Sequence, residues 1–160
     1  MNKKPAEGTP ELRKMLLSSK PSDFGLAPTP DLPHVWGTMM EMRVGKAVVS
    51  LIAVAEGSTS LYFSTGGGVI GGGEHEAVRA ANRKLLAFVD KALDLFVPIE
   101  RPLDVMDAAV SFAVLTHEGL RGARDEERKI VERRSPLWPA FYLGQDVITA
   151  LRLTAEKTGA

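Results

Sequence analysis

A glycine-rich segment is the feature that most restricts how this chain can fold. Residues 66–73 contain six glycines, interrupted only by Val69 and Ile70. Fixing a glycine in ordered structure costs about 0.5–1 kcal/mol relative to alanine, because the glycine backbone loses more conformational freedom. The segment must therefore supply what other residues cannot: a positive φ, a close approach of two backbones, or mobility. We call residues 64–76 the glycine-rich hinge.

Hydrophobic periodicity predicts strands before the hinge and a long helix after it. Three apolar segments separated by short turns precede the hinge, and short turns make neighbouring strands antiparallel. Strict alternation in the first segment would place Trp36 on the same face as Met40 and Met42. After the hinge, apolar residues recur at helical spacing. The pattern predicts strands over residues 35–43, 46–55, 59–64, 108–116 and 120–124, and helices over residues 74–96 and 137–157.

The N-terminal region has a different composition. Residues 1–8 have the character of a disordered tail. Thr9 and Pro10 are a typical helix start, and they predict a short helix to about Ser18. The following segment to residue 33 carries four prolines, which fix extended backbone. We expect this proline-rich strap to cross the surface, anchored by Phe24 and Leu26.

These elements together predict an α+β domain. Their order is α-βββ-α-ββ-α, and an antiparallel sheet of about five strands with helices packed on it would bury every apolar stripe. We expect one such domain over residues 34–160, after the tail (1–8) and the N-terminal helix and strap (9–33). This make-up resembles that of small profilin-like and roadblock-like domains, as architecture only, and such a likeness implies little about function.

Composition excludes several classes of function. Lys and Arg number 20, as do Asp and Glu, whereas a nucleic-acid-binding protein normally has a basic excess. The absence of cysteine excludes disulfides, thiolate catalysis and Cys-ligated metals. No apolar run approaches the roughly 18 residues of a membrane span, and no signal peptide is evident at the N-terminus. We therefore expect a cytoplasmic, bacterial protein that binds neither nucleic acid nor membrane.

Phosphate binding is one interpretation of the hinge, because a strand, a glycine loop and a helix start can form an anion site. Gly66, Gly68 and Gly71 satisfy the G-x-G-x-x-G spacing of dinucleotide-binding loops. That motif belongs to a parallel βαβ unit, whereas the strands before this hinge form an antiparallel meander. Glu74 and Glu76 would also repel a phosphate at the helix start.

The histidines are the other candidates for chemistry. His75-Glu76 and His117-Glu118 both follow predicted strands, and they could form a metal or acid–base cluster if those strand ends met. No H-E-x-x-H motif is present, and adjacent residues do not face the same way in a strand or helix. We expect no metal, no cofactor and no catalytic residue, so the sequence favours a protein that is not an enzyme.

The leading hypothesis is a non-enzymatic protein–protein interaction or regulatory domain that self-associates through a sheet edge or a helix face. The alternative is a small-molecule-binding domain, for a nucleotide or phosphorylated metabolite, with its site at the hinge. Val69 and Ile70 either pin the hinge to the core or present an apolar tip to a partner. Under both hypotheses the candidate binding residues are Ser64, Thr65, Gly66, Gly67, Gly68, Val69, Ile70, Gly71, Gly72, Gly73 and His75.

Overall fold

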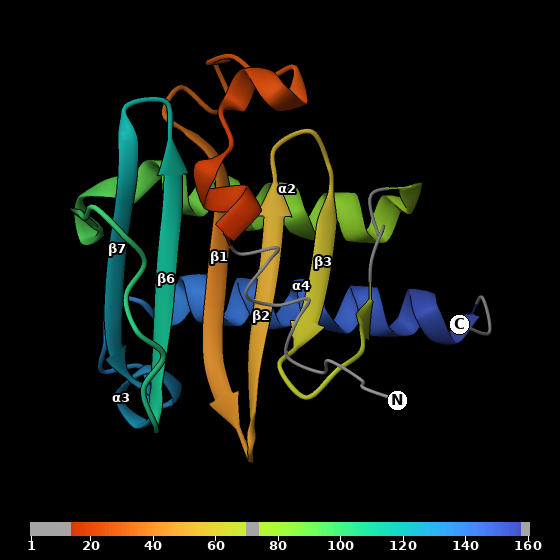
Figure 1. The fold of residues 1–160 in the computed structure, drawn as a ribbon, viewed down its shortest axis with the longest axis vertical. Coiled ribbons are helices and arrows are strands. Elements are labelled where there is room, and N and C mark those ends of the chain that lie inside the picture. Colours follow the sequence, from red (N-terminus) through yellow and green to blue (C-terminus); the bar gives the residue numbers. More distant parts are fainter. Residues whose placement is uncertain (1–13, 70–73, 158–160) are drawn as a thin grey trace.

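The computed structural model describes residues 14–69 and 74–157, and it contains one antiparallel sheet of seven strands (Figure 1). The strand order is β4-β3-β2-β1-β6-β7-β5. The strands are β1 (Val35–Val44), β2 (Ala47–Val54), β3 (Thr59–Phe63), β4 (Gly68–Val69), β5 (Val97–Pro98), β6 (Ala109–Thr116) and β7 (Gly119–Glu126). The helices are α2 (Glu76–Lys91), α3 (Glu127–Val131) and α4 (Trp138–Lys157), with helical turns η1 (Pro21–Phe24) and η3 (Leu93–Leu95); residues 14–18 are also helical.

The predicted α+β class and the antiparallel meander before the hinge are confirmed. β1 pairs with β2 and β2 with β3, both antiparallel. The predicted count of about five strands is wrong, because β4 and β5 add one two-residue strand at each edge of the sheet. Two-residue strands have no hydrophobic period, so the pattern that reveals the five longer strands cannot reveal these.

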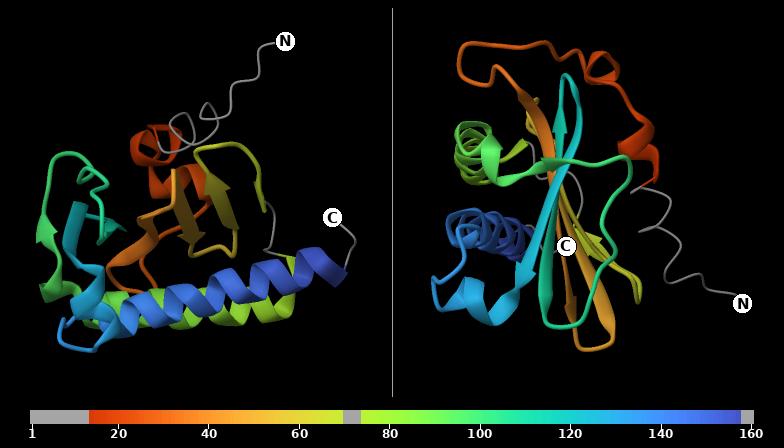
Figure 2. Two further views of the ribbon diagram at one scale, coloured as in Figure 1. Left: turned by 90° about the horizontal axis from the view of Figure 1, so that it is seen from below. Right: turned by 90° about the vertical axis from the view of Figure 1, so that its left-hand side faces the viewer.

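Both long helices lie on one face of the sheet. α2 and α4 run side by side across the strands, in opposite directions along the chain (Figures 1 and 2). The buried side of α2 carries Val78, Leu85, Leu86 and Val89, which join the main core with inward residues of the strands, such as Phe112. None of the helices in the described part of the chain is long and apolar enough to cross a membrane.

The N-terminal segment covers part of the opposite face, where a second, smaller core forms. Leu16 is buried there against Trp36 and Met39, and the predicted strap anchors Phe24 and Leu26 are confirmed as packing on the same cluster. The Phe24 and Trp36 ring centroids lie 5.7 Å apart. The strap therefore gives the sheet a second hydrophobic layer.

Trp36 does not lie on the same face of the sheet as Met40 and Met42, as strict alternation predicts. It belongs to the strap-side core, whereas Met40 and Met42 belong to the helix-side core. The pairing of β1 with β6 shifts register between Val35 and Gly37. Such a bulge inserts one residue into the strand, and every side chain before it changes face relative to those after it.

Two polar residues of α2 fasten the helix to the sheet. Near the start of α2, the Asn82 side-chain amide donates to Thr59 Oγ1 at 2.8 Å and to the Val54 carbonyl at 3.2 Å. Near its end, Asp90 Oδ2 accepts hydrogen bonds from the backbone N–H groups of His34 at 2.9 Å and Val35 at 2.8 Å. These bonds tie α2 to the β2–β3 turn and to the first residues of β1, which fixes the orientation of the helix.

Candidate functional site

The first half of the hinge forms a hairpin between β3 and β4. The Gly66 N–H donates to the Phe63 carbonyl at 2.9 Å, and the Phe63 N–H donates to the Gly67 carbonyl at 3.2 Å. Gly66, Gly67 and Gly68 have φ angles of 111°, 85° and 154°. A Cβ on Gly68 would overlap the carbonyl oxygen of Leu61. These glycines therefore supply positive φ angles and a close backbone approach.

The other described hinge residues also contact the sheet. The Ser64 hydroxyl accepts a hydrogen bond from the Val48 N–H at 2.7 Å, and Val69 is half-buried against the helix-side core. Thr65 is exposed in the turn. The remaining predicted site residues, Ile70 and glycines 71 to 73, lie outside the described residues. Ser64 and Val69 hold the ends of the turn to the body of the domain.

The start of α2 is occupied by an internal charge cluster. His75 precedes the helix as its N-cap residue, without a capping hydrogen bond from its side chain. Arg79 donates to Glu76 Oε1 at 2.8 Å, and Arg83 donates to Glu76 Oε2 at 3.1 Å. The hydrogen bond from Arg79, and then that from Arg83, lower the pKa of the Glu76 carboxyl below its ordinary value. Both arginines are thus engaged by a carboxylate at the position where a phosphate would have to bind.

The histidines do not come together as one cluster. The His117 N–H donates to the His34 carbonyl at 3.0 Å, and the His34 N–H donates to Asp90 near the end of α2. His75 lies before the start of the same helix, and 15 residues at about 1.5 Å each separate it from Asp90 by roughly 20 Å. Within residues 14–69 and 74–157, no group of three or more His, Asp or Glu side chains is placed to hold a metal ion.

Both edges of the sheet are poorly suited to pairing with another chain. The edge strands β4 and β5 have two residues each, and one residue of β5 is Pro98, which has no N–H to donate. Beyond β5, the edge of β7 is contacted by the segment before β6: Arg124 donates to the Asp104 carbonyl at 3.0 Å. Short, proline-containing and covered edges are how sheets avoid edge-to-edge association.

The outer side of the helix layer carries a groove between α2 and α4. Its volume is about 670 Å³, and among the described residues Figure 2 shows no helix or strand over this side of the two helices. Small or apolar side chains form most of its walls. On α2 these are Ala77, Ala80 and Ala81, and on α4 they are Leu143, Thr149, Ala150, Leu153 and Thr154.

The two charged side chains of the groove have no charged partner among the described residues. Lys84 on α2 and Asp146 on α4 line opposite walls, and both are exposed. Neither side chain forms an ion pair or hydrogen bond with another residue that the structure describes. Leu153, toward the other end of the groove, is 55% exposed, and it is the most exposed large apolar side chain of α4. The groove thus combines apolar walls with one unpaired charge of each sign.

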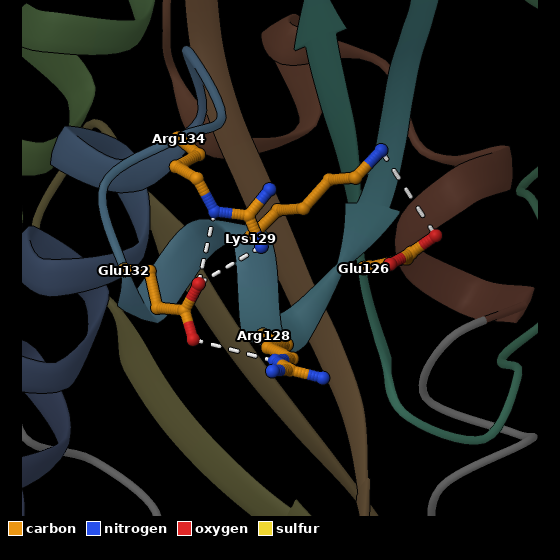
Figure 3. Close-up of polar contacts among 5 residues, drawn as sticks. All are labelled: Glu126, Arg128, Lys129, Glu132 and Arg134. Atoms are coloured by element: carbon orange, nitrogen blue, oxygen red, sulfur yellow. Dashed lines mark hydrogen bonds and ion pairs between the residues drawn. The ribbon is translucent and has the colours of Figure 1, made fainter.

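The charged segment around α3 differs from the groove because its charges are paired within the chain. Glu132 lies 3.3 Å from Arg128 and 2.9 Å from Arg134, and Lys129 lies 4.0 Å from Glu126 (Figure 3). The hydrogen bond from Arg134, followed by that from Arg128, lowers the pKa of the Glu132 carboxyl. The density of both charges in residues 125–134 predicts a solvated loop or an exposed helical turn, and the structure forms the end of β7 followed by α3 there.

The aromatic residues at the start of α4 are likewise engaged within the chain. The Arg133 guanidinium lies 4.5 Å from the ring centroid of Trp138 and 5.7 Å from that of Tyr142. The Tyr142 hydroxyl donates to the Val131 carbonyl at 3.2 Å. Trp138 is half-buried and packs against the main core. Its ring is therefore engaged by the core and by Arg133, while Tyr142 links α4 to the end of α3.

The chain matches no known protein family model, no curated protein and no solved structure. What the groove can bind therefore follows from its own geometry. Sequence reasoning missed it, although one signal was present: Ala77, Ala80, Ala81 and Lys84 recur at helical spacing beside the main apolar stripe of α2. A second stripe of small residues on a helix indicates that another helix packs closely beside it. The width of the groove between the two helices, however, depends on how both are placed on the sheet.

Proposed function

We propose that this chain is a non-enzymatic protein–protein interaction or regulatory domain and that the α2–α4 groove is its contact surface. The observation that carries the proposal is that Lys84 and Asp146, on the walls of an apolar groove, form no ion pair with any other described residue. Charged side chains on an isolated helix surface are usually solvated or matched within the chain, as they are around α3. In the groove they flank apolar surface, which is the composition of an interface rim around its core.

The shape of the groove also favours a protein over a small molecule. Ligand sites are usually concave and bury most of the ligand. This groove is open along the outer side of two helices and extends from Ala77 to Lys84 on α2, about two turns. An open, elongated groove between helices is a surface into which another helix fits by ridges and grooves. We therefore assign the leading hypothesis to a helix face and not to a sheet edge.

Site-specific photo-crosslinking in cells of the source organism tests this proposal. A benzophenone amino acid at Thr149, on the α4 wall, is expected to yield a discrete adduct whose partner is identified by mass spectrometry. The same amino acid at exposed Lys46, in the β1–β2 turn, is the matched control and should yield none. An added Ala80→Arg substitution, which fills the groove, is expected to abolish the Thr149 adduct. Equal, diffuse labelling from both positions would refute a contact function for the groove.

A further inference from the structure

We infer that the partner is a second copy of this chain. The α2–α4 faces of the two copies pack against each other, so that the two helix pairs form a four-helix layer between two sheets. This inference rests on the proposed function of the groove and names its partner. Three properties of the same surface support a second copy: the antiparallel course of the two helices, the position of the two groove charges, and the area that the helices offer.

The antiparallel course of α2 and α4 makes the face suitable for two-fold pairing. A two-fold axis along the groove places α2 of one copy over α4 of the other, at the same level along the groove. Because α2 and α4 run in opposite directions (Figure 1), every neighbouring pair in the resulting layer is antiparallel. Neighbouring helices are also antiparallel in up-and-down four-helix bundles, where the side chains of facing helices interdigitate.

The same axis pairs the groove charges. Lys84 and Asp146 lie on opposite walls near one end of the groove. The two-fold rotation brings Lys84 of each copy over Asp146 of the other, and it therefore creates two ion pairs between the copies. The chain itself has no net charge to oppose association, since 20 basic residues balance 20 acidic ones. A charged layer within an otherwise apolar contact also fixes the register of helices.

The apolar part of the groove supplies the buried surface. Leu153, 55% exposed in one copy, would lie over Ala77 and Ala80 of the other, where side chains are small enough to admit it. The 16 residues of α2 and the 20 of α4 are about 24 and 30 Å long, with axes roughly 10 Å apart. Together the two helices cover a flat, projected area of the order of 500 Å². Their accessible surface is larger than this projection, because side chains protrude from it. A stable interface buries roughly 800 Å² of accessible surface on each partner.

Sedimentation equilibrium of the purified chain at high micromolar concentration tests the inference. The unmodified chain is expected to be a dimer. Lys84→Glu places acids over acids in both symmetry-related contacts, and Asp146→Lys places bases over bases. Since like charges facing each other across an interface are strongly unfavourable, each single reversal should weaken dimerisation by about 100-fold. The double reversal restores opposite charges and should return the dimer dissociation constant to within about threefold of its original value.

Two controls keep the outcome interpretable. Lys46→Glu makes the same change of charge at an exposed residue of the β1–β2 turn, away from the α2–α4 face, and it should leave the dimer unchanged. At concentrations low enough for every variant to be monomeric, the melting temperatures should agree, because both groove charges are exposed and have no described partner. A failure of the double reversal to rescue a weakened dimer would count against direct pairing of the two residues.

Other outcomes overturn the inference in different ways. A monomer at every concentration, or a dimer insensitive to both single reversals, would exclude the second copy as the occupant. If the Thr149 crosslinker then joins a different protein, the contact function of the groove stands and only its partner is wrong. If it joins nothing, both proposals fail.

Discussion

Replacing Asp90 with alanine is expected to lower the free energy of unfolding by about 2–4 kcal/mol. Asp90 is only 7% exposed, and its Oδ2 accepts two backbone hydrogen bonds from the residues that begin β1. Alanine would leave the buried Val35 N–H without an acceptor, and this desolvated donor accounts for most of the loss. Urea denaturation followed by circular dichroism measures the change, with the midpoint expected to fall at an unchanged slope.

Two substitutions separate the hydrogen bonds of Asp90 from the mere loss of a charge. Asp90→Asn keeps a side-chain oxygen acceptor, and we expect it to cost about 1 kcal/mol. Asp94→Ala removes an exposed acid from the turn just after α2, and it should change stability by less than about 0.5 kcal/mol. If all three variants had the same stability, the anchoring role of Asp90 would be wrong.

Gly68→Ala is expected to cost about 2–4 kcal/mol, because two effects act on the same residue. Its φ of 154° is one that side chains rarely adopt, and the new Cβ would overlap the Leu61 carbonyl oxygen in the paired strand. The hairpin can relieve the overlap only by separating β4 from β3. The cost is therefore limited by the free energy of that local separation, and Val69 should lose its packing against the core at the same time.

Gly67→Ala is the matched control for the overlap. Gly67 also has a positive φ, 85°, but a Cβ there meets no atom within 4 Å. Only the left-handed backbone penalty remains, about 1–2 kcal/mol. Amide hydrogen exchange distinguishes the variants further: faster exchange at Val69 and its neighbours in β3 is expected for Gly68→Ala alone. Equal losses of stability in the two variants would show that the close approach of β3 and β4 does not matter.

The regular elements were predictable from sequence because their apolar residues repeat. The alternation of β6 and the stripe of α2 expose their period directly, and β2 is recognised by its nearly continuous apolar run. Local departures from regularity were not predictable. The bulge that moves Trp36 to the strap side leaves no trace in the order of apolar residues, and the two-residue edge strands are too short to have a period.

The candidate site was predictable only in part, because it depends on contacts distant in sequence. The hinge stood out in the sequence by its glycines, and three of them have positive φ angles in the β3–β4 hairpin. The groove joins residues about 70 positions apart, such as Ala80 and Thr149, and its width follows from how Asn82 and Asp90 set α2 on the sheet. No local pattern encodes that distance.

The hinge and the groove are thereby connected through α2. The hairpin of Gly66 and Gly68 precedes the helix along the chain, and Asp90 fixes the helix end. Between these points, α2 presents Ala77, Ala80 and Lys84 to the outer side. Disruption of either anchor is therefore expected to weaken dimerisation as well as stability, whereas the groove substitutions should affect dimerisation alone.

An inter-subunit distance measurement tests the central claim, that two copies meet through the α2–α4 face, most directly. The chain has no cysteine, so one introduced cysteine carries a single spin label. With the label at exposed Arg152 of α4, pulsed electron resonance should give one narrow distance distribution below about 30 Å, since diagonal helices of a four-helix layer lie roughly 14 Å apart. A label at Lys46 should report a much longer distance. The absence of coupling at Arg152, or a shorter distance at Lys46 than at Arg152, would contradict the claim.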